Sequence, residues 1–164
     1  MDTNAIGDES LRWQIENYIG NITKKGYALV SAVLFGSRAR GDNLTSSDVD
    51  LLLVVENPDK NFVERLQIFS ALWGHKTPLE VFVYTPDEVR EMFVRGSITL
   101  YDALNEGVLI RDTNFMTHLK QAFKIALDEK ILSKSVRGWW KLPEDQNSLK
   151  TRLEESFRRQ QVAR

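Results

Sequence analysis

Hydrophobic residues recur along this chain with two different spacings, and each spacing predicts one kind of element. A three-to-four spacing, which places apolar residues on one face of a helix, covers residues 10–24, 62–73, 99–105 and 115–132. Nearly continuous apolar runs, typical of strands buried on both faces, cover residues 28–35, 49–55, 79–84 and 108–111. Their alternation predicts a mixed, twisted sheet of about four strands flanked by helices, an α+β fold with an α/β-like order of elements.

Local signals predict two further helices. Residues 85–88, Thr-Pro-Asp-Glu, have the sequence of a capping box with proline at the first helical position, so a helix is expected to begin there and to run toward Arg95. Near the C-terminus, a narrow apolar stripe at helical spacing predicts a last helix and consists of Leu149, Leu153 and Phe157. The C-terminal part of the chain is therefore expected to be helical.

Length and charge suggest how the chain is divided. Its 164 residues match one ordinary domain, and strand-like segments stop after Asp112. We expect a domain over residues 1–112 and a helical extension over 113–164 that packs on the same domain or on a second subunit. The net charge of −1 divides into −6 over the first part and +5 over the second. The basic extension could face nucleic acid, a polyphosphate or an acidic partner, although plain solvated helices carry such charge as well.

Composition excludes several kinds of site. The chain has no cysteine and two histidines, which removes disulfides, a thiol nucleophile, thiolate metal sites and a His-rich zinc site. Any bound metal must therefore have oxygen ligands. No apolar run is long enough to span a bilayer, and the polar, acidic first nine residues do not read as a secretory signal. We expect a cytoplasmic protein without membrane contact.

Two aspartates begin the second predicted strand. Asp48 and Asp50 are two residues apart, so both carboxylates point to one face with Cα atoms roughly 6–7 Å apart. Such a pair repels by about 4 kcal/mol at an effective dielectric near 20, so it needs a cation or a shared proton. Mg²⁺ suits carboxylate oxygens and phosphates, and a two-ion site fits this spacing. The ordinary alternative is that these aspartates cap a turn.

The segment before these aspartates carries groups suited to phosphate. Gly36 and Ser37 follow the first predicted strand, where free backbone N–H groups and a hydroxyl can hold phosphate oxygens. Arg38 and Arg40 add two guanidinium groups, which suit a triphosphate and a leaving pyrophosphate. The two arginines are equally well interpreted as ordinary surface charges, and Arg40 is the stronger candidate for the triphosphate.

This segment resembles the motif of the DNA polymerase beta-like nucleotidyltransferase superfamily, and within it the minimal nucleotidyltransferases, some of which act as antitoxins. The matched pattern, with residues often seen inside it, consists of Gly36-Ser37, Arg40-Gly41, Ser47 and Asp48-Val49-Asp50. Asp-x-Asp alone is a weak signal, but ten residues behind Gly-Ser and between two apolar strands it is a strong one. The resemblance covers residues 10–112 by order of elements and is specific over residues 34–54.

The resemblance implies the nucleotidyltransferase fold and transfer of a nucleoside monophosphate, with AMP from ATP favoured, to an acceptor hydroxyl with release of pyrophosphate. It implies that Asp48 and Asp50 hold two Mg²⁺ ions and that a third carboxylate on the next strand, here Glu80, completes the metal site and serves catalysis. The implied nucleotide-binding residues are Gly36, Ser37, Arg38, Arg40 and Ser47. Many members carry aspartate where this chain has Glu80, which could instead be a solvent-facing strand residue.

The acceptor and the partners stay open at this stage. A protein such as a toxin, a small molecule, as in the similar antibiotic-modifying transferases, or an RNA end could accept the nucleotide. A second hypothesis is an antitoxin-like module that masks a toxin or RNA partner through its basic C-terminal helices, with weak or no catalysis. All three implied metal ligands are present, which favours activity. A homodimer is compatible with either hypothesis.

Two other features have a functional and an ordinary interpretation. Arg111 and His118 are spaced as in the HEPN-type ribonucleases that partner minimal nucleotidyltransferases, but a surface histidine is the more ordinary interpretation. Trp139 and Trp140 could stack on bases, whereas aromatic residues between two helices more often dock on a core or on a subunit interface. Neither feature changes the main hypothesis.

Overall fold

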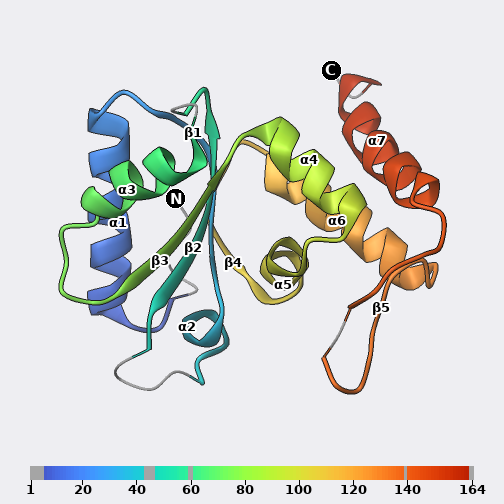
Figure 1. Cartoon of the computed structure of the whole chain (residues 1–164), viewed down its shortest axis with the longest axis horizontal. Helices are drawn as coiled ribbons and strands as arrows, with labels where there is room; N and C mark the ends of the chain where they lie inside the picture. Colours follow the sequence, from blue (N-terminus) through green and yellow to red (C-terminus); the bar gives the residue numbers. More distant parts are fainter. Residues whose placement is uncertain (1–5, 43–46, 59–60, 139, 163–164) are drawn as a thin grey trace.

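A mixed four-stranded sheet runs through the centre of the molecule (Figure 1). The computed structural model describes residues 6–42, 47–58, 61–138 and 140–162. The strands of the sheet are β1 (Ala28–Phe35), β2 (Val49–Glu56), β3 (Leu79–Tyr84) and β4 (Val108–Asp112). Their order is β3-β2-β1-β4, with β1 antiparallel to both its neighbours and β2 parallel to β3. The predicted fold class is confirmed.

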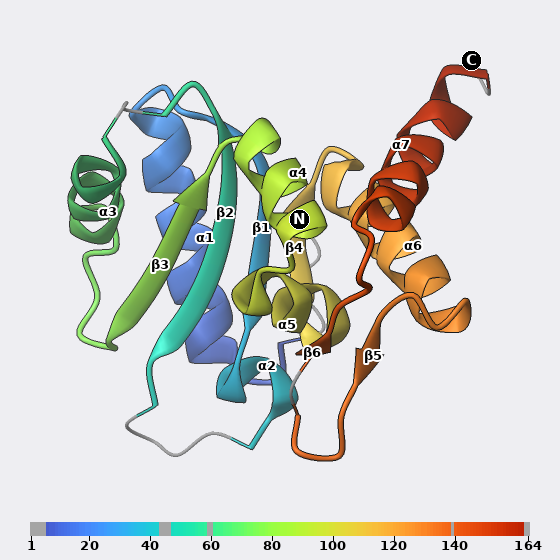
Figure 2. The ribbon, with the colours of Figure 1, turned by 45° about the vertical axis from the view of Figure 1, so that its right-hand side comes forward.

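Helices cover the sheet from both sides (Figures 1 and 2). On one face lie α1 (Glu9–Lys24) and α3 (Phe62–Ala71). The other side holds α4 (Pro86–Arg95), α5 (Ile98–Glu106), α6 (Phe115–Asp128) and α7 (Asn147–Val162). Alternate residues of β2 serve the two sides: Leu53 joins the cluster under α1 and α3, whereas Leu52 joins the cluster under α4 to α7. Apolar residues therefore fill both faces of this strand, as its nearly continuous hydrophobic run predicts.

The start of α4 has the capping box that the sequence predicts. The Thr85 hydroxyl accepts a hydrogen bond from the Glu88 N–H at 3.2 Å, and the Glu88 carboxylate accepts one from the Thr85 N–H at 2.8 Å. Pro86 occupies the first turn. Arg65 of α3 donates to the same Glu88 carboxylate at 2.7 Å, so this helix start also binds a neighbouring element.

The predicted elements differ from the structure mainly after residue 128. The prediction that the helix beginning at residue 115 continues to residue 132 is wrong, because α6 ends at Asp128 and Lys130 has a left-handed φ of 58°. The short hairpin of β5 (Ser133–Lys134) and β6 (Trp140–Lys141) was not predicted. Trp140 docks on the Tyr101 and Phe123 rings, at 5.6 and 5.3 Å between centroids. Trp139 lies outside the described residues.

The C-terminal helices are joined to the sheet through one carboxylate. Asp112, the last residue of β4, accepts a hydrogen bond from the Ser31 hydroxyl of β1 at 2.5 Å and others from Met116 and Thr117 in the first turn of α6. The division of the chain at residue 112 into two units stays a prediction. In the described part of the chain, no helix has both the length and the apolar character needed to cross a membrane.

Candidate active site

Gly36 forms the turn between β1 and the short helix α2 (Ser37–Arg40), directly after the first predicted strand. Its backbone has φ 71° and ψ −158°, a region that is essentially restricted to glycine. A Cβ atom at Gly36 would collide with Oδ2 of Asp50 and lie 3.0 Å from Cγ of the same side chain. A side chain is therefore excluded here both by the backbone and by the space that the Asp50 carboxylate occupies.

Asp50 and Glu80 are direct neighbours across the parallel strands β2 and β3. Burial is the main cause that raises the pKa of Asp50 to about 6; the charge of Glu80, a hydrogen bond between the two carboxyl groups and the charge of Asp48 raise it further, while Arg40 acts in the opposite sense. The two carboxyl groups thus share a partly desolvated place where two full negative charges are unfavourable.

Asp48 precedes β2 and is exposed. The charge of Asp48 contributes to the raised pKa of Asp50. Its side chain, however, does not lie close enough to those of Asp50 and Glu80 for the three to hold a metal ion together. Within the described ranges, no group of three or more His, Cys, Asp or Glu side chains is arranged to hold a metal ion. The structure therefore brings two of the three predicted carboxylates together and leaves Asp48 at the edge of the pair.

Arg38 faces the protein. Its side chain is only 8% exposed, its Nε donates to the Ser47 carbonyl at 2.9 Å, and its guanidinium lies 4.0 Å from the Asp8 carboxylate. The side chain thus connects α2 with the start of β2 and with the start of α1. These contacts give Arg38 a structural role, and the binding of a nucleotide by Arg38 and Ser47 stays a prediction.

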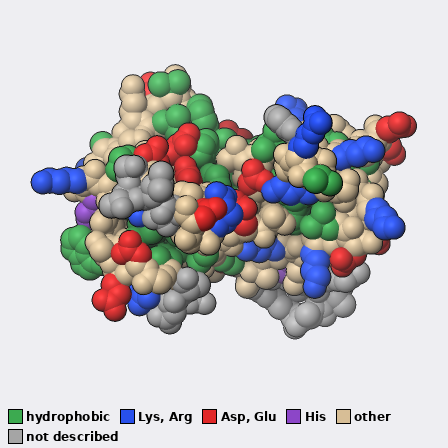
Figure 3. All heavy atoms as spheres, turned by 90° about the horizontal axis from the view of Figure 1, so that it is seen from below, with side chains coloured by type: hydrophobic (Ala, Val, Ile, Leu, Met, Phe, Trp, Pro, Cys, Tyr) green, Lys and Arg blue, Asp and Glu red, His purple; other side chains and the backbone are tan. Residues whose placement is uncertain are grey.

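Arg40 lies on the exposed side of α2. It donates to Asp42 at 3.1 Å and to Glu106 of α5 at 2.5 Å, and these two hydrogen bonds raise its pKa further above the ordinary arginine value. The α2 end of the molecule is the lower end in Figures 1 and 2, and Figure 3 looks onto it. Acidic and basic side chains stand together over the middle of this face, while Lys and Arg side chains are more frequent over the half built by α4 to α7.

Of the predicted site residues, Gly36, Asp50 and Glu80 are thus in contact, Ser37 follows directly on Gly36, and Arg40 is close enough to influence Asp50. Sequence reasoning missed Glu106, which is 66 positions away from its partner Arg40. No local signal could have identified it, because the pairing arises only when α5 packs beside α2.

The interpretation of His118 as a surface residue is wrong. His118 is 7% exposed on the inner side of α6, and its ring lies 5.3 Å from that of Phe157. Neither ring nitrogen has a hydrogen-bond partner among the residues that the structure describes. Arg111 is on β4, paired with Ala32, so the two residues do not share a helix face.

The family model of the nucleotidyltransferase domain matches residues 16–159, which include the whole Gly-Ser and Asp-x-Asp segment. No match was found among curated proteins. Three similar solved structures are toxin–antitoxin complexes, each 17% identical to this chain. A toxin–antitoxin with AMP-PNP covers 80% of this chain and 90% of its own, with a TM-score of 0.44. The toxin–antitoxin MntA-HepT covers 73% and 88% (TM-score 0.44), and a tri-AMPylated Shewanella oneidensis HEPN toxin with MNT antitoxin covers 72% and 88% (TM-score 0.42).

The family model spans nearly the whole chain, from α1 into α7. It also contains the Gly36 turn and the Asp50–Glu80 pair, which meet at one end of the sheet. This chain belongs to the nucleotidyltransferase domain family.

Proposed function

We propose that this nucleotidyltransferase transfers AMP from ATP to an acceptor hydroxyl in a Mg²⁺-dependent reaction that releases pyrophosphate. The observation that carries the proposal is the Asp50–Glu80 carboxyl pair, held against Gly36 at the turn that begins α2. Family membership supports nucleotidyl transfer in general.

The carboxylates fit a hard divalent cation. All donors are oxygens, and a cation would offset both the burial of the Asp50 carboxylate and its repulsion with Glu80, which together raise the pKa of Asp50. Asp50 and Glu80 would hold the metal, and Asp48 would complete the set by turning toward them from its exposed position before β2. Bound there, two Mg²⁺ ions would neutralise charge on the attacking and the leaving oxygens.

The other residues would bind and orient the triphosphate. We propose that the Ser37 hydroxyl and the backbone at Gly36 contact its oxygens and that Arg40 exchanges its contacts with Asp42 and Glu106 for the departing phosphates. In the reaction, the acceptor oxygen bonds to the α-phosphorus while the bond from that phosphorus to the β-bridging oxygen breaks. Glu80 would take the proton of the hydroxyl, and pyrophosphate leaves.

The first experiment measures binding of each of the four nucleoside triphosphates, with and without Mg²⁺, and pyrophosphate release. It compares the wild type with Asp50→Asn and Glu80→Gln. Asp128→Asn is the matched control, because Asp128 is exposed at the end of α6. We expect Mg²⁺-dependent binding, tightest for ATP, that both site variants lose and the control keeps. Equal binding by the wild type and Asp50→Asn would refute the site, and a preference for another base would refute only the choice of ATP.

The acceptor is addressed separately. Mass spectrometry of a protein that co-purifies with the chain would show an added nucleotide monophosphate if the chain modifies that partner. A stable complex whose partner carries no added mass, in the presence of ATP and Mg²⁺, would favour the masking hypothesis over transfer to that partner. The same preparation made with Asp50→Asn provides the unmodified reference mass.

A further inference from the structure

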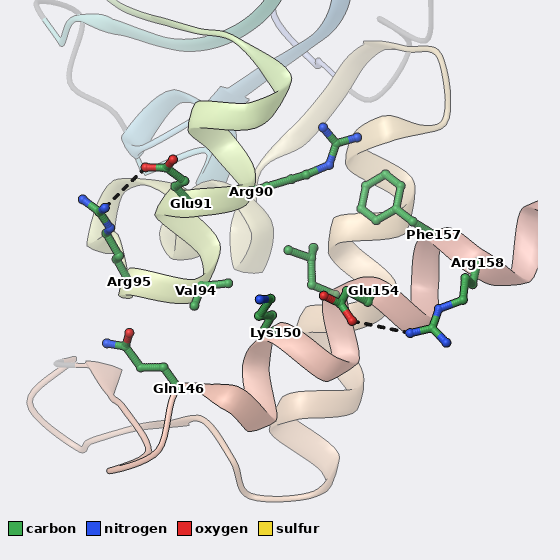
Figure 4. Close-up of a pocket in the computed structure, with 10 residues that line it drawn as sticks. Arg90, Glu91, Val94, Arg95, Gln146, Lys150, Glu154, Phe157 and Arg158 are labelled. Atoms are coloured by element: carbon green, nitrogen blue, oxygen red, sulfur yellow. Dashed lines mark hydrogen bonds and ion pairs between the residues drawn. The ribbon is translucent and has the colours of Figure 1, made fainter.

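A groove of about 730 Å³ lies between α4 and α7, away from the α2 end of the sheet. Figure 4 shows the side chains of the two helices that border it, with α6 behind. The groove uses none of the residues of the candidate active site. Its apolar floor consists of Val94 of α4 together with Leu153 and Phe157 of α7.

The floor is apolar, and its aromatic ring already has neighbours. Phe157 is the aromatic residue that lines the groove, and its ring already contacts Phe115 at 5.5 Å and His118 at 5.3 Å between centroids. The Arg90 guanidinium also lies 5.0 Å from the centre of this ring. A nucleobase that stacked on Phe157 would compete with Arg90 for this ring, whereas aliphatic side chains can pack on Val94 and Leu153.

The rim of the groove is basic. Four basic residues and two acidic residues line it: Arg90, Arg95, Lys150 and Arg158, with Glu91 and Glu154. Lys150 is exposed and makes no ion pair with any residue in the described ranges. In Figure 4 its side chain stands between the two helices, beside Val94.

Two of the three ion pairs that the rim arginines make with described residues are weak. Arg95 and Glu91 are 3.5 Å apart, Arg158 and Glu154 are 3.4 Å apart, and both pairs are exposed and within one helix. Such pairs contribute little to stability, so their arginines can turn to a carboxylate that enters the groove. The excess of positive charge therefore selects for an acidic occupant.

From this apolar floor and basic rim we infer that the α4–α7 groove binds an acidic amphipathic helix of a partner protein. Two helical walls provide the ridges against which a third helix can pack, and an apolar stripe on that helix would meet Val94 and Leu153. Acidic residues flanking the stripe would face Lys150, Arg95 and Arg158, while Arg90 keeps its ion pair with Asp87 at 2.8 Å. This is the helix-in-groove mode of recognition, in which apolar anchors give affinity and flanking charges give orientation.

The test uses a fluorescein-labelled peptide of about four helical turns, with leucines on one face and glutamates elsewhere, and the same peptide with lysines for glutamates. Fluorescence anisotropy with the full chain is expected to show saturable binding of the acidic peptide only. Lys150→Glu is expected to weaken this binding by about tenfold or more. The matched control, Lys124→Glu, makes the same charge change on an exposed part of α6 outside the groove and should change binding less than about twofold.

A second variant tests the apolar floor. Val94→Thr keeps the shape of the side chain and replaces a methyl group with a hydroxyl, so the chain should stay folded while peptide binding weakens by about threefold. Circular dichroism checks the fold of each variant. If Lys150→Glu weakened binding while Val94→Thr had no effect, the peptide would bind through surface charge alone, and the proposal would be overturned.

Other outcomes would also overturn it. Three of them concern the peptide: equal loss of binding in Lys124→Glu, equal binding of the lysine peptide, or no binding up to about 1 mM peptide. Two concern another occupant: tighter binding of a labelled single-stranded RNA that Lys150→Glu abolishes, or self-association of the chain that the same variant disrupts. The groove and the nucleotidyl site are tested independently. Asp50→Asn should bind the acidic peptide normally, and Lys150→Glu should release pyrophosphate at the wild-type rate.

Discussion

Gly36 matters to the candidate site both for its backbone conformation and for its contact with a site carboxylate. The positive φ and the contact with Asp50 are two separate reasons for glycine at this position. Gly41, the C-cap of α2, also has a positive φ of 78°, but among the described residues no atom outside its chain neighbours lies within 4 Å of a Cβ placed there. The two glycines therefore allow backbone strain to be separated from the collision with the carboxylate.

We predict that Gly36→Ala lowers the free energy of unfolding by about 1–3 kcal/mol, the range for a residue forced into such a conformation, and abolishes binding of the triphosphate. Gly41→Ala should destabilise the chain by a similar or smaller amount and retain nucleotide binding. Urea unfolding and nucleotide titration of both variants provide the measurement. If Gly36→Ala binds nucleotide as well as Gly41→Ala does, the close contact between Gly36 and the Asp50 carboxylate is not required for nucleotide binding.

The carboxyl pair gives a second prediction at this scale. Without metal, Asp50→Asn should increase the free energy of unfolding at neutral pH by about 1 kcal/mol, because it removes a partly buried charge and its repulsion with Glu80, both reduced by solvent screening. Mg²⁺ should raise the melting temperature of the wild type but not that of the variant.

A double-mutant cycle provides the control for this prediction. Glu80→Gln should stabilise the metal-free chain by a similar amount, and the double variant should gain less than the sum of the two, because both substitutions relieve one repulsion. Additive gains, or a lower melting temperature for Asp50→Asn, would show that the two carboxyl groups do not interact unfavourably.

Among the elements, α4 illustrates how a local signal acquires a tertiary role. Its capping box was predicted from residues 85–88 alone, but the structure adds the hydrogen bond from the nearly buried Arg65 to Glu88. Burial alone would raise the pKa of Glu88; the hydrogen bonds from Arg65 and from the Thr85 backbone outweigh this effect and lower it below the ordinary value.

The sign of the pH dependence follows from this lowered pKa. Glu88 should stabilise the fold fully above pH 4.5, its unperturbed value, and this contribution should be lost as the pH falls through the lower pKa of the folded state. Glu88→Gln should therefore reduce the melting temperature at pH 7 and show a smaller difference from the wild type near pH 3. Asp87→Asn, in the same turn but with a side chain 92% exposed, should change stability by less than about 0.5 kcal/mol. A constant Glu88→Gln difference across this pH range would contradict the prediction.

At the scale of the whole molecule, the two hydrophobic clusters share the strands of one sheet. Leu52 and Leu53 are adjacent in β2 and fully buried, yet they belong to opposite clusters. We predict that Leu52→Ala and Leu53→Ala each lower the free energy of unfolding by about 2–5 kcal/mol and shift one common transition.

Coincident urea curves from far-UV circular dichroism and tryptophan fluorescence would check this cooperativity. Ile98→Ala, at a side chain 53% exposed, is the control and should shift the transition only slightly. An early separate transition in Leu52→Ala, with loss of helix before loss of the sheet, would instead show that residues 113–164 unfold as an independent unit.

Much of this architecture could be predicted from short-range patterns. The predicted strand over residues 79–84 and the helix beginning after Thr85 agree with the structure in their bounds. The hairpin of β5 and β6 could not be predicted, because strands of two residues are too short to show a periodic pattern. The helix that begins at residue 115 was predicted too long for a different reason. Its apolar spacing continues to Leu132, but in the structure the chain turns back after Asp128 and the Leu132 N–H donates to the Ala126 carbonyl.

The sequence by itself determined the four strands of the sheet, most of the helices and the Gly-Ser and Asp-x-Asp motif, because periodicity, capping and motif spacing act between residues a few positions apart. Only the tertiary structure decided that Asp50 meets Glu80 while Asp48 stays exposed, that Glu106 holds Arg40, and that α4 and α7 enclose a groove. Each of these depends on strand register or helix packing between distant segments. Such contacts are the sum of many weak interactions over both faces of the sheet, and no short stretch of sequence contains them.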